Sequence, residues 1–122
     1  MDELSERIKV LRDAGFVDEK GARDLEAIAD VLTRECGVSR DNEVLGTLVT
    51  HVAAAIKRAR DGEEVTPLDP AVIEEVRTSP VYARARRIQQ EVLAAMGGKL
   101  SAPERDFVLV HVGGLLLSQA SE

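Results

Sequence analysis

Tryptophan is absent from this chain of 122 residues, and other aromatic side chains are scarce, with one Tyr and two Phe. A core without large rings must consist mainly of Val, Leu, Ile and Ala, and these are plentiful in a chain that is 44% hydrophobic. Aromatic platforms for stacking unpaired bases, which single-strand nucleic-acid binders use, have little material here. The length suits one domain with a single core, residues 1–122.

Cysteine and positive charge are also in short supply. Cys36 is the only cysteine, so no intramolecular disulfide can form, which favours a reducing cytoplasm. Lys and Arg number 16 against 22 Asp and Glu, for a net charge of -6. This excess of negative charge repels phosphate groups and argues against direct nucleic-acid binding or attachment to anionic membranes. The longest apolar run, around 107–117, is shorter than a membrane span, so we expect a cytoplasmic protein without membrane insertion.

The motifs of common catalytic and metal sites are missing as well. Two histidines and one cysteine do not show metal-ligand spacing, and neither Cys-x-x-Cys nor His-x-x-x-His occurs. No glycine-rich phosphate loop follows a strand, and the serines lack the context of a nucleophile elbow. The sequence therefore predicts no metal, no cofactor and no catalytic residues, and it favours a non-enzymatic role.

Helical periodicity is what the sequence has in quantity. Apolar residues recur every three or four positions along most of the chain, whereas strand signals are nearly absent. Asp69 before Pro70 indicates a helix start, and Gly97–Gly98 indicates a helix end. We expect an all-α fold, a single compact bundle of five to six helices, over residues 2–13, 18–35, 41–62, 70–77, 80–96 and from 101 onward.

Each of the two histidines has a charged residue seven positions away on the same expected helix. Seven steps of about 100° nearly complete two turns, so His51 shares a face with Arg58, and His111 shares one with Glu104. The two members of a pair are roughly 10 Å apart along the helix, too far for contact. Contacts would have to form across helices, and we predict that the two imidazoles approach each other in the fold.

The same residues have explanations that need no function. A histidine at the edge of an apolar stripe is commonly a boundary residue, and Arg58 near a helix C-terminus interacts favourably with the macrodipole. Glu104 has the spacing of a capping-box partner for Ser101. An exposed helical arginine contributes little to stability, so Arg58→Ala is expected to leave the domain folded and stable.

Taken in order, these features resemble the phosphotransferase-system regulation domain, or PRD, a helical module of bacterial sugar-operon antiterminators and transcriptional activators. Segment 50–64, THVAAAIKRARDGEE, is similar to the family's histidine, Ala/Ile stretch, arginine at plus seven and glycine. Segment 79–116 resembles its Pro-Tyr segment, long amphipathic helix, turn, Glu, aromatic and His. The interval between His51 and His111 also fits, and the likeness covers essentially the whole chain, most specifically 45–117.

The resemblance implies that His51 and His111 are phosphorylation sites, with Arg58 and Glu104 as supporting residues that orient or charge-balance the imidazoles. It implies a histidine phosphocarrier protein or a sugar-transporter component of the phosphotransferase system as donor. Phosphorylation would then switch the association of a homodimer or a partner, in transcription regulation. The module normally follows a nucleic-acid-binding domain, whereas residues 1–40 read as acidic helices, so we expect a stand-alone module.

Two alternatives stay open from the residues alone. One is an unphosphorylated dimerisation or scaffold domain with the same fold. The other is a small-molecule-binding helical bundle or minor enzyme that uses both histidines as acid–base groups, which a closed pocket around the imidazoles would favour. Separately, segment 106–117, DFVLVHVGGLLL, is apolar nearly all round, and we expect a second subunit to cover part of this last helix.

Overall fold

The computed structural model of the protein describes residues 2–64, 66–96 and 100–120 and is all-helical, as predicted. No strand occurs in these ranges. Six helices follow one another: α1 (Glu3–Asp13), α2 (Glu19–Cys36), α3 (Glu43–Asp61), α4 (Pro70–Arg77), α5 (Tyr82–Ala95) and α6 (Ala102–Ala120).

Local side-chain chemistry sets most helix ends. The first four helices each begin after an Asp or Asn whose side-chain oxygen accepts a backbone N–H of the first turn, at Asp2, Asp18, Asn42 and Asp69. Gly37 and Gly62 end α2 and α3 in the left-handed conformation, with φ of 67° and 70°, which glycine adopts without steric cost. These signals are short-range, which is why the sequence predicted the bounds closely.

The expected start of the fifth helix at residue 80 is wrong, because α5 begins at Tyr82. The Ser79 hydroxyl donates back to the Val76 carbonyl at 2.8 Å, and the Tyr82 N–H donates to the Ser79 carbonyl at 3.3 Å. Residues 79–81 therefore form a turn that connects α4 to α5 rather than a first helical turn. Gly97 and Gly98, the expected end of this helix, lie outside the described residues.

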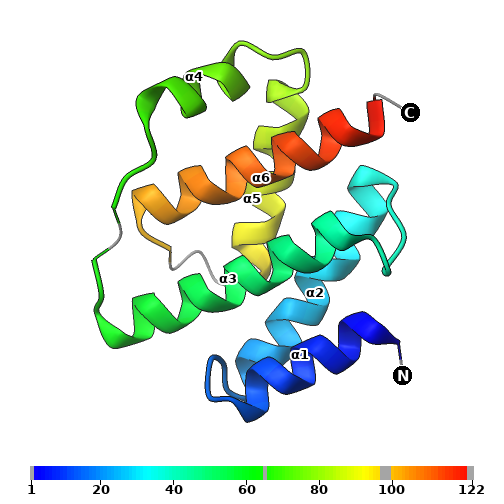
Figure 1. Cartoon of the computed structure of the whole chain (residues 1–122), viewed down its shortest axis with the longest axis vertical. Coiled ribbons are helices and arrows are strands. Elements are labelled where there is room, and N and C mark those ends of the chain that lie inside the picture. The colour runs from blue at the N-terminus through cyan, green and yellow to red at the C-terminus, as the bar shows by residue number, and fades with distance from the viewer. Residues whose placement is uncertain (1, 65, 97–99, 121–122) are drawn as a thin grey trace.

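The helices are arranged around α2, which contacts α1, α3, α5 and α6 (Figure 1). In this view α3 and α6 lie side by side and run in opposite directions, in front of α2 and α5. Helix α1 packs on α2 and α3 at one end of the molecule, and α4 packs on α6 at the other. The α3–α6 pair is therefore an outer layer over the core, and it carries both histidines.

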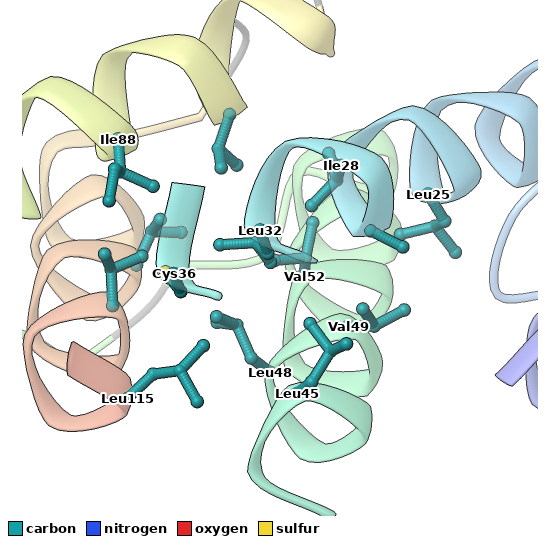
Figure 2. Close-up of a cluster of buried hydrophobic side chains, with 14 of the residues drawn as sticks. Leu25, Ile28, Leu32, Cys36, Leu45, Leu48, Val49, Val52, Ile88 and Leu115 are labelled. Atoms are coloured by element: carbon teal, nitrogen blue, oxygen red, sulfur yellow. The ribbon is translucent and has the colours of Figure 1, made fainter. Parts of the chain in front are cut away.

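The core is aliphatic, as the shortage of aromatic residues requires (Figure 2). Leu32 of α2 lies at its centre, with neighbours from α3, α5 and α6 that are buried almost completely, among them Leu48, Val52, Ile88 and Leu115. Cys36 is a buried free thiol, and burial raises its pKa to about 11, which keeps it protonated and unreactive.

The strongly apolar α6 is covered mostly by its own chain. It contacts α2, α3, α4 and α5, and Val112 and Leu115 are completely buried among them. Only Leu117, at 40% exposure, remains a large exposed apolar side chain on this helix. Four helices of the same chain therefore bury most of α6, and a second subunit over its remaining exposed part stays a prediction.

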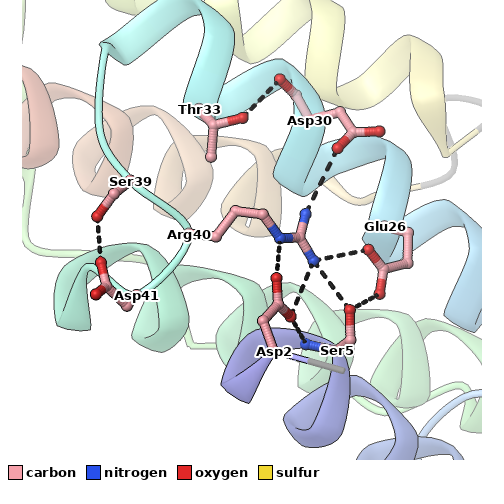
Figure 3. Close-up of polar contacts among 8 residues, drawn as sticks. All are labelled: Asp2, Ser5, Glu26, Asp30, Thr33, Ser39, Arg40 and Asp41. Carbon is pink, nitrogen blue, oxygen red and sulfur yellow. Dashed lines mark hydrogen bonds and ion pairs between the residues drawn. The ribbon is translucent and has the colours of Figure 1, made fainter.

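Arg40, in the loop between α2 and α3, connects three parts of the chain (Figure 3). Its guanidinium donates to Asp2 and to Ser5 of α1, the latter at 3.0 Å, and to Glu26 of α2 at 3.0 Å. This network holds the start of α1 against α2 and includes neither histidine, so we assign it a structural role.

Two adjacent glycines of α6 offer a matched stability test. A Cβ at Gly113 would lie 3.1 Å from Val76 of α4, whereas nothing lies within 4 Å of one at Gly114. We expect Gly114→Ala to raise the free energy of unfolding by about 0.5–1 kcal/mol through helix propensity. Gly113→Ala should gain less than this or lose stability, because its Cβ would press on Val76 and that side chain must shift. Urea denaturation measures both, and equal effects would contradict this contact.

Candidate functional site

The antiparallel packing of α3 and α6 brings the two histidines together. The ring centroids of His51 and His111 are 5.0 Å apart, and the ring planes are inclined by 53°. Both residues are half-buried, so neither histidine is enclosed in the core. The predicted approach of the two histidines is confirmed, and it occurs within one chain.

The charged partners meet across the same two helices. Arg58 donates from Nε to Oε1 of Glu104 at 2.8 Å and from Nη2 to Oε2 at 3.3 Å, a two-pronged pair. In an antiparallel pair, seven residues forward on α3 correspond to seven residues backward on α6. The equal spacing therefore places Arg58 beside Glu104 once His51 is beside His111. We call the following five residues the histidine seam: His51, Arg58, Glu104, Phe107 and His111.

The structure changes the interpretation of both charged residues. Glu104 is only 3% exposed, and both of its carboxylate oxygens accept from α3, so its side chain is more than a local cap for α6. Arg58 is not an isolated surface cation, since it neutralises this buried carboxylate while its own side chain keeps 34% exposure. The expectation that Arg58 contributes little to stability assumed an exposed arginine without a buried partner. The pairing with Glu104 removes that assumption.

Phe107 completes the seam, although the sequence reasoning gave it no role. Its ring stacks on His111 with centroids 4.2 Å apart and contacts His51 edge-on at 5.2 Å. It lies four residues before His111 and three after Glu104, which places all three on one face of α6. This spacing from Glu104 and His111, in a chain with two Phe, is the sequence signal that could have identified Phe107 as part of the site.

The electrostatics of the seam favour a neutral His51. Burial lowers the pKa of this imidazole below its ordinary value, and positive charge on His111 and on Arg58 lowers it further. A neutral imidazole has a free nitrogen lone pair and can act as a nucleophile near neutral pH. The seam therefore holds the neutral ring of His51 beside the ring of His111.

This lowered pKa predicts a pH dependence of stability. The unfolded chain retains the ordinary value of 6.5 for His51, so it binds more protons than the folded chain as pH falls below that value. The free energy of unfolding is therefore unaffected by this group above pH 6.5. It decreases as the pH falls from 6.5 toward the lower pKa of His51 in the folded chain. We expect a smaller decrease in His51→Gln, measured by denaturation between pH 8 and pH 5. Parallel curves for the two proteins would contradict the shift.

Other kinds of site find little support in the described ranges. No group of three His, Cys, Asp or Glu side chains there is arranged to hold a metal ion. Four cavities in the described part have neither histidine in their lining, so they provide no closed pocket around the imidazoles. None of the helices, over the residues described, combines the length and apolarity that crossing a membrane requires.

The fold and the seam together define a class: a small all-helical module with two adjacent, half-buried histidines on antiparallel helices. The chain belongs to the PRD domain family, whose model matches residues 26–115. That range contains His51, Arg58, Glu104 and His111 and omits α1. The protein is therefore a regulatory domain related to the phosphotransferase system.

A comparison with curated proteins adds one relative. The chain is 26% identical over 119 residues to the uncharacterised protein YhfY of Escherichia coli strain K12. The match covers 98% of this chain and 99% of that protein, so the likeness includes α1 as well as the PRD segment. No solved structure matches the chain.

Proposed function

We propose that the protein receives phosphoryl groups on His51 and His111 and thereby switches its association with a partner or a second copy. The observation that carries the proposal is the pair of half-buried rings 5.0 Å apart in a chain of the PRD family. The donor is a histidine phosphocarrier protein or a sugar-transporter component of the phosphotransferase system. The role is regulatory and non-catalytic, in transcription regulation within the cytoplasm.

The charges of the seam explain how phosphate would act as a switch. A phosphoryl group on either histidine adds about -1.5 to -2 of charge to the face that also carries the buried carboxylate of Glu104. Arg58 is the cation shared by this seam, and it is held by Glu104 before phosphorylation. The added phosphate competes for the guanidinium, so charge gained at a histidine is transmitted to the α3–α6 packing.

The surface around the seam suits a contact that phosphate can modify. Val44 lies two turns before His51 on the same face of α3 and is 42% exposed. This face has an exposed apolar residue, Val44, at one end and the two histidines at its centre. Phosphate on a histidine changes the charge of the face, so it can favour docking in one phosphorylation state and oppose it in the other. We propose this face as the one that a second copy or a partner protein covers.

The direct test is phosphate transfer in vitro. The protein is incubated with labelled phosphoenolpyruvate, the first enzyme of the phosphotransferase system, its phosphocarrier and sugar-transporter components. We expect covalent label that is lost in acid and stable in alkali, as phosphohistidine is. Sedimentation before and after labelling then reports any change in association. Failure to label with the complete set of donors would refute the proposal and favour the scaffold alternative.

A further inference from the structure

The two nitrogens of His111 have different environments. Nδ1 lies 2.9 Å from the backbone carbonyl oxygen of Phe107, four residues earlier in α6. A carbonyl oxygen can only accept, so this hydrogen bond requires the proton of the neutral ring to be on Nδ1. Nε2, on the far side of the ring, then carries the free lone pair.

The packing of the ring preserves this arrangement. Phe107 stacks on His111 with an interplanar angle of 25°, and His51 lies close to the same ring. Turning the His111 ring over would break the bond to the carbonyl and disturb these contacts. His51 has no comparable constraint, because no hydrogen bond to its ring nitrogens occurs within the described residues.

We infer that Nε2 of His111 is the atom that accepts phosphate, and that the Phe107 carbonyl keeps the proton on Nδ1 during transfer. The inference rests on the proposed function and specifies its chemistry. It assigns to a backbone atom the positioning role that a carboxylate has for other reactive histidines. His51, without such a partner, is not assigned an accepting nitrogen.

The transfer step balances without a further reactant. The Nε2 lone pair attacks the phosphorus of a protonated phosphohistidine on the donor protein. The new N–P bond forms as the donor's N–P bond breaks, and the donor imidazole leaves with the electron pair as a neutral ring. His111 becomes a phosphorylated imidazolium whose Nδ1–H stays on the Phe107 carbonyl. That hydrogen bond strengthens as the ring gains positive charge, which stabilises transfer at Nε2.

Attack through Nδ1 is disfavoured by the same geometry. It would require the loss of the bond to the Phe107 carbonyl, and the phosphoryl group would then lie against the backbone of its own helix. The structure therefore selects one phosphohistidine isomer at His111.

Nuclear magnetic resonance of 15N-histidine-labelled protein tests the inference in two stages. The variant His51→Gln leaves His111 as the sole histidine, and long-range proton–nitrogen spectra at pH 8 report its tautomer. We expect the Nδ1–H form to predominate, and an Nε2–H form would overturn the inference. His111→Gln is the matched control, in which His51 should lack this preference. Circular dichroism confirms that both variants remain folded.

In the second stage the His51→Gln protein is phosphorylated from phosphoenolpyruvate through the first enzyme and the phosphocarrier. We expect phosphorus coupling to Nε2 and none to Nδ1. Coupling at Nδ1 would overturn the inference while leaving the proposed function standing. Label on the wild type but none on this variant would overturn it too, since His111 would then be no acceptor. If the wild type itself takes no label, the proposed function fails and the inference fails with it.

Discussion

Arg58→Ala is expected to lower the free energy of unfolding by about 2 kcal/mol, more than a typical surface arginine contributes. The reason is Glu104, which is 3% exposed and would be left as a buried carboxylate without its cation. Removing one member of a fully buried ion pair costs about 3–5 kcal/mol. The smaller figure allows for the 34% exposure of Arg58, which lets water reach the gap. Urea denaturation at pH 7 measures the loss.

Two further variants separate this effect from a general loss of helix stability. In Arg58→Ala/Glu104→Met the buried charge is gone, and we expect most of the stability to return. Lys57→Ala changes the neighbouring cation, whose partner Asp61 is exposed to a similar degree, and should cost about 0.5 kcal/mol or less. Equal losses in Arg58→Ala and Lys57→Ala would show that the Glu104 contact contributes nothing specific.

Substitution of the histidines is expected to have the largest effect on phosphate acceptance. His51→Ala and His111→Ala should each remove part of the acid-labile label, and the double variant should remove all of it. Each single variant retains one imidazole in contact with Phe107, and therefore one nucleophile. Quantified label per folded protein is the measurement, with Lys57→Ala as the control that keeps both rings.

Label that persists in the double histidine variant would refute the assigned sites. Phosphate on Ser or Thr is stable in acid, unlike phosphohistidine, so the acid stability of the remaining label would show which kind of residue carries it. Arg58→Ala should label less than the wild type or lose its phosphate faster, because the guanidinium is the cation available to the phosphoryl group. Its lower stability makes a folding control at the labelling temperature necessary.

The helices could be read from the sequence because their signals are local. The start of α3 depends on Asn42 bonding to the Leu45 N–H three residues away, and its end depends on the backbone freedom of Gly62. Two expected starts come two residues too early, at residue 41 before α3 and at residue 80 before α5. Before α5 the Ser79 hydroxyl bonds back to the Val76 carbonyl instead of forward into the next helix, and the sequence pattern is compatible with both.

The site was predicted only in part. The equal seven-residue spacing suggested that two faces meet, and it correctly placed His51 near His111. It did not show that Glu104 is desolvated or that Phe107 contacts both rings. Burial is a property of what surrounds a residue, and the residues that cover Glu104 come from distant parts of the chain.

The sequence by itself determined the helices and the position of each residue around its own helix axis, since backbone hydrogen bonds and caps act over a few residues. The tertiary structure alone decided which faces meet, because packing depends on contacts between residues far apart in the chain. The antiparallel placement of α3 against α6 turned two separate His–charge spacings into one ring pair and one ion pair. It also packed four helices against α6, so that most of an apolar segment is buried by its own chain.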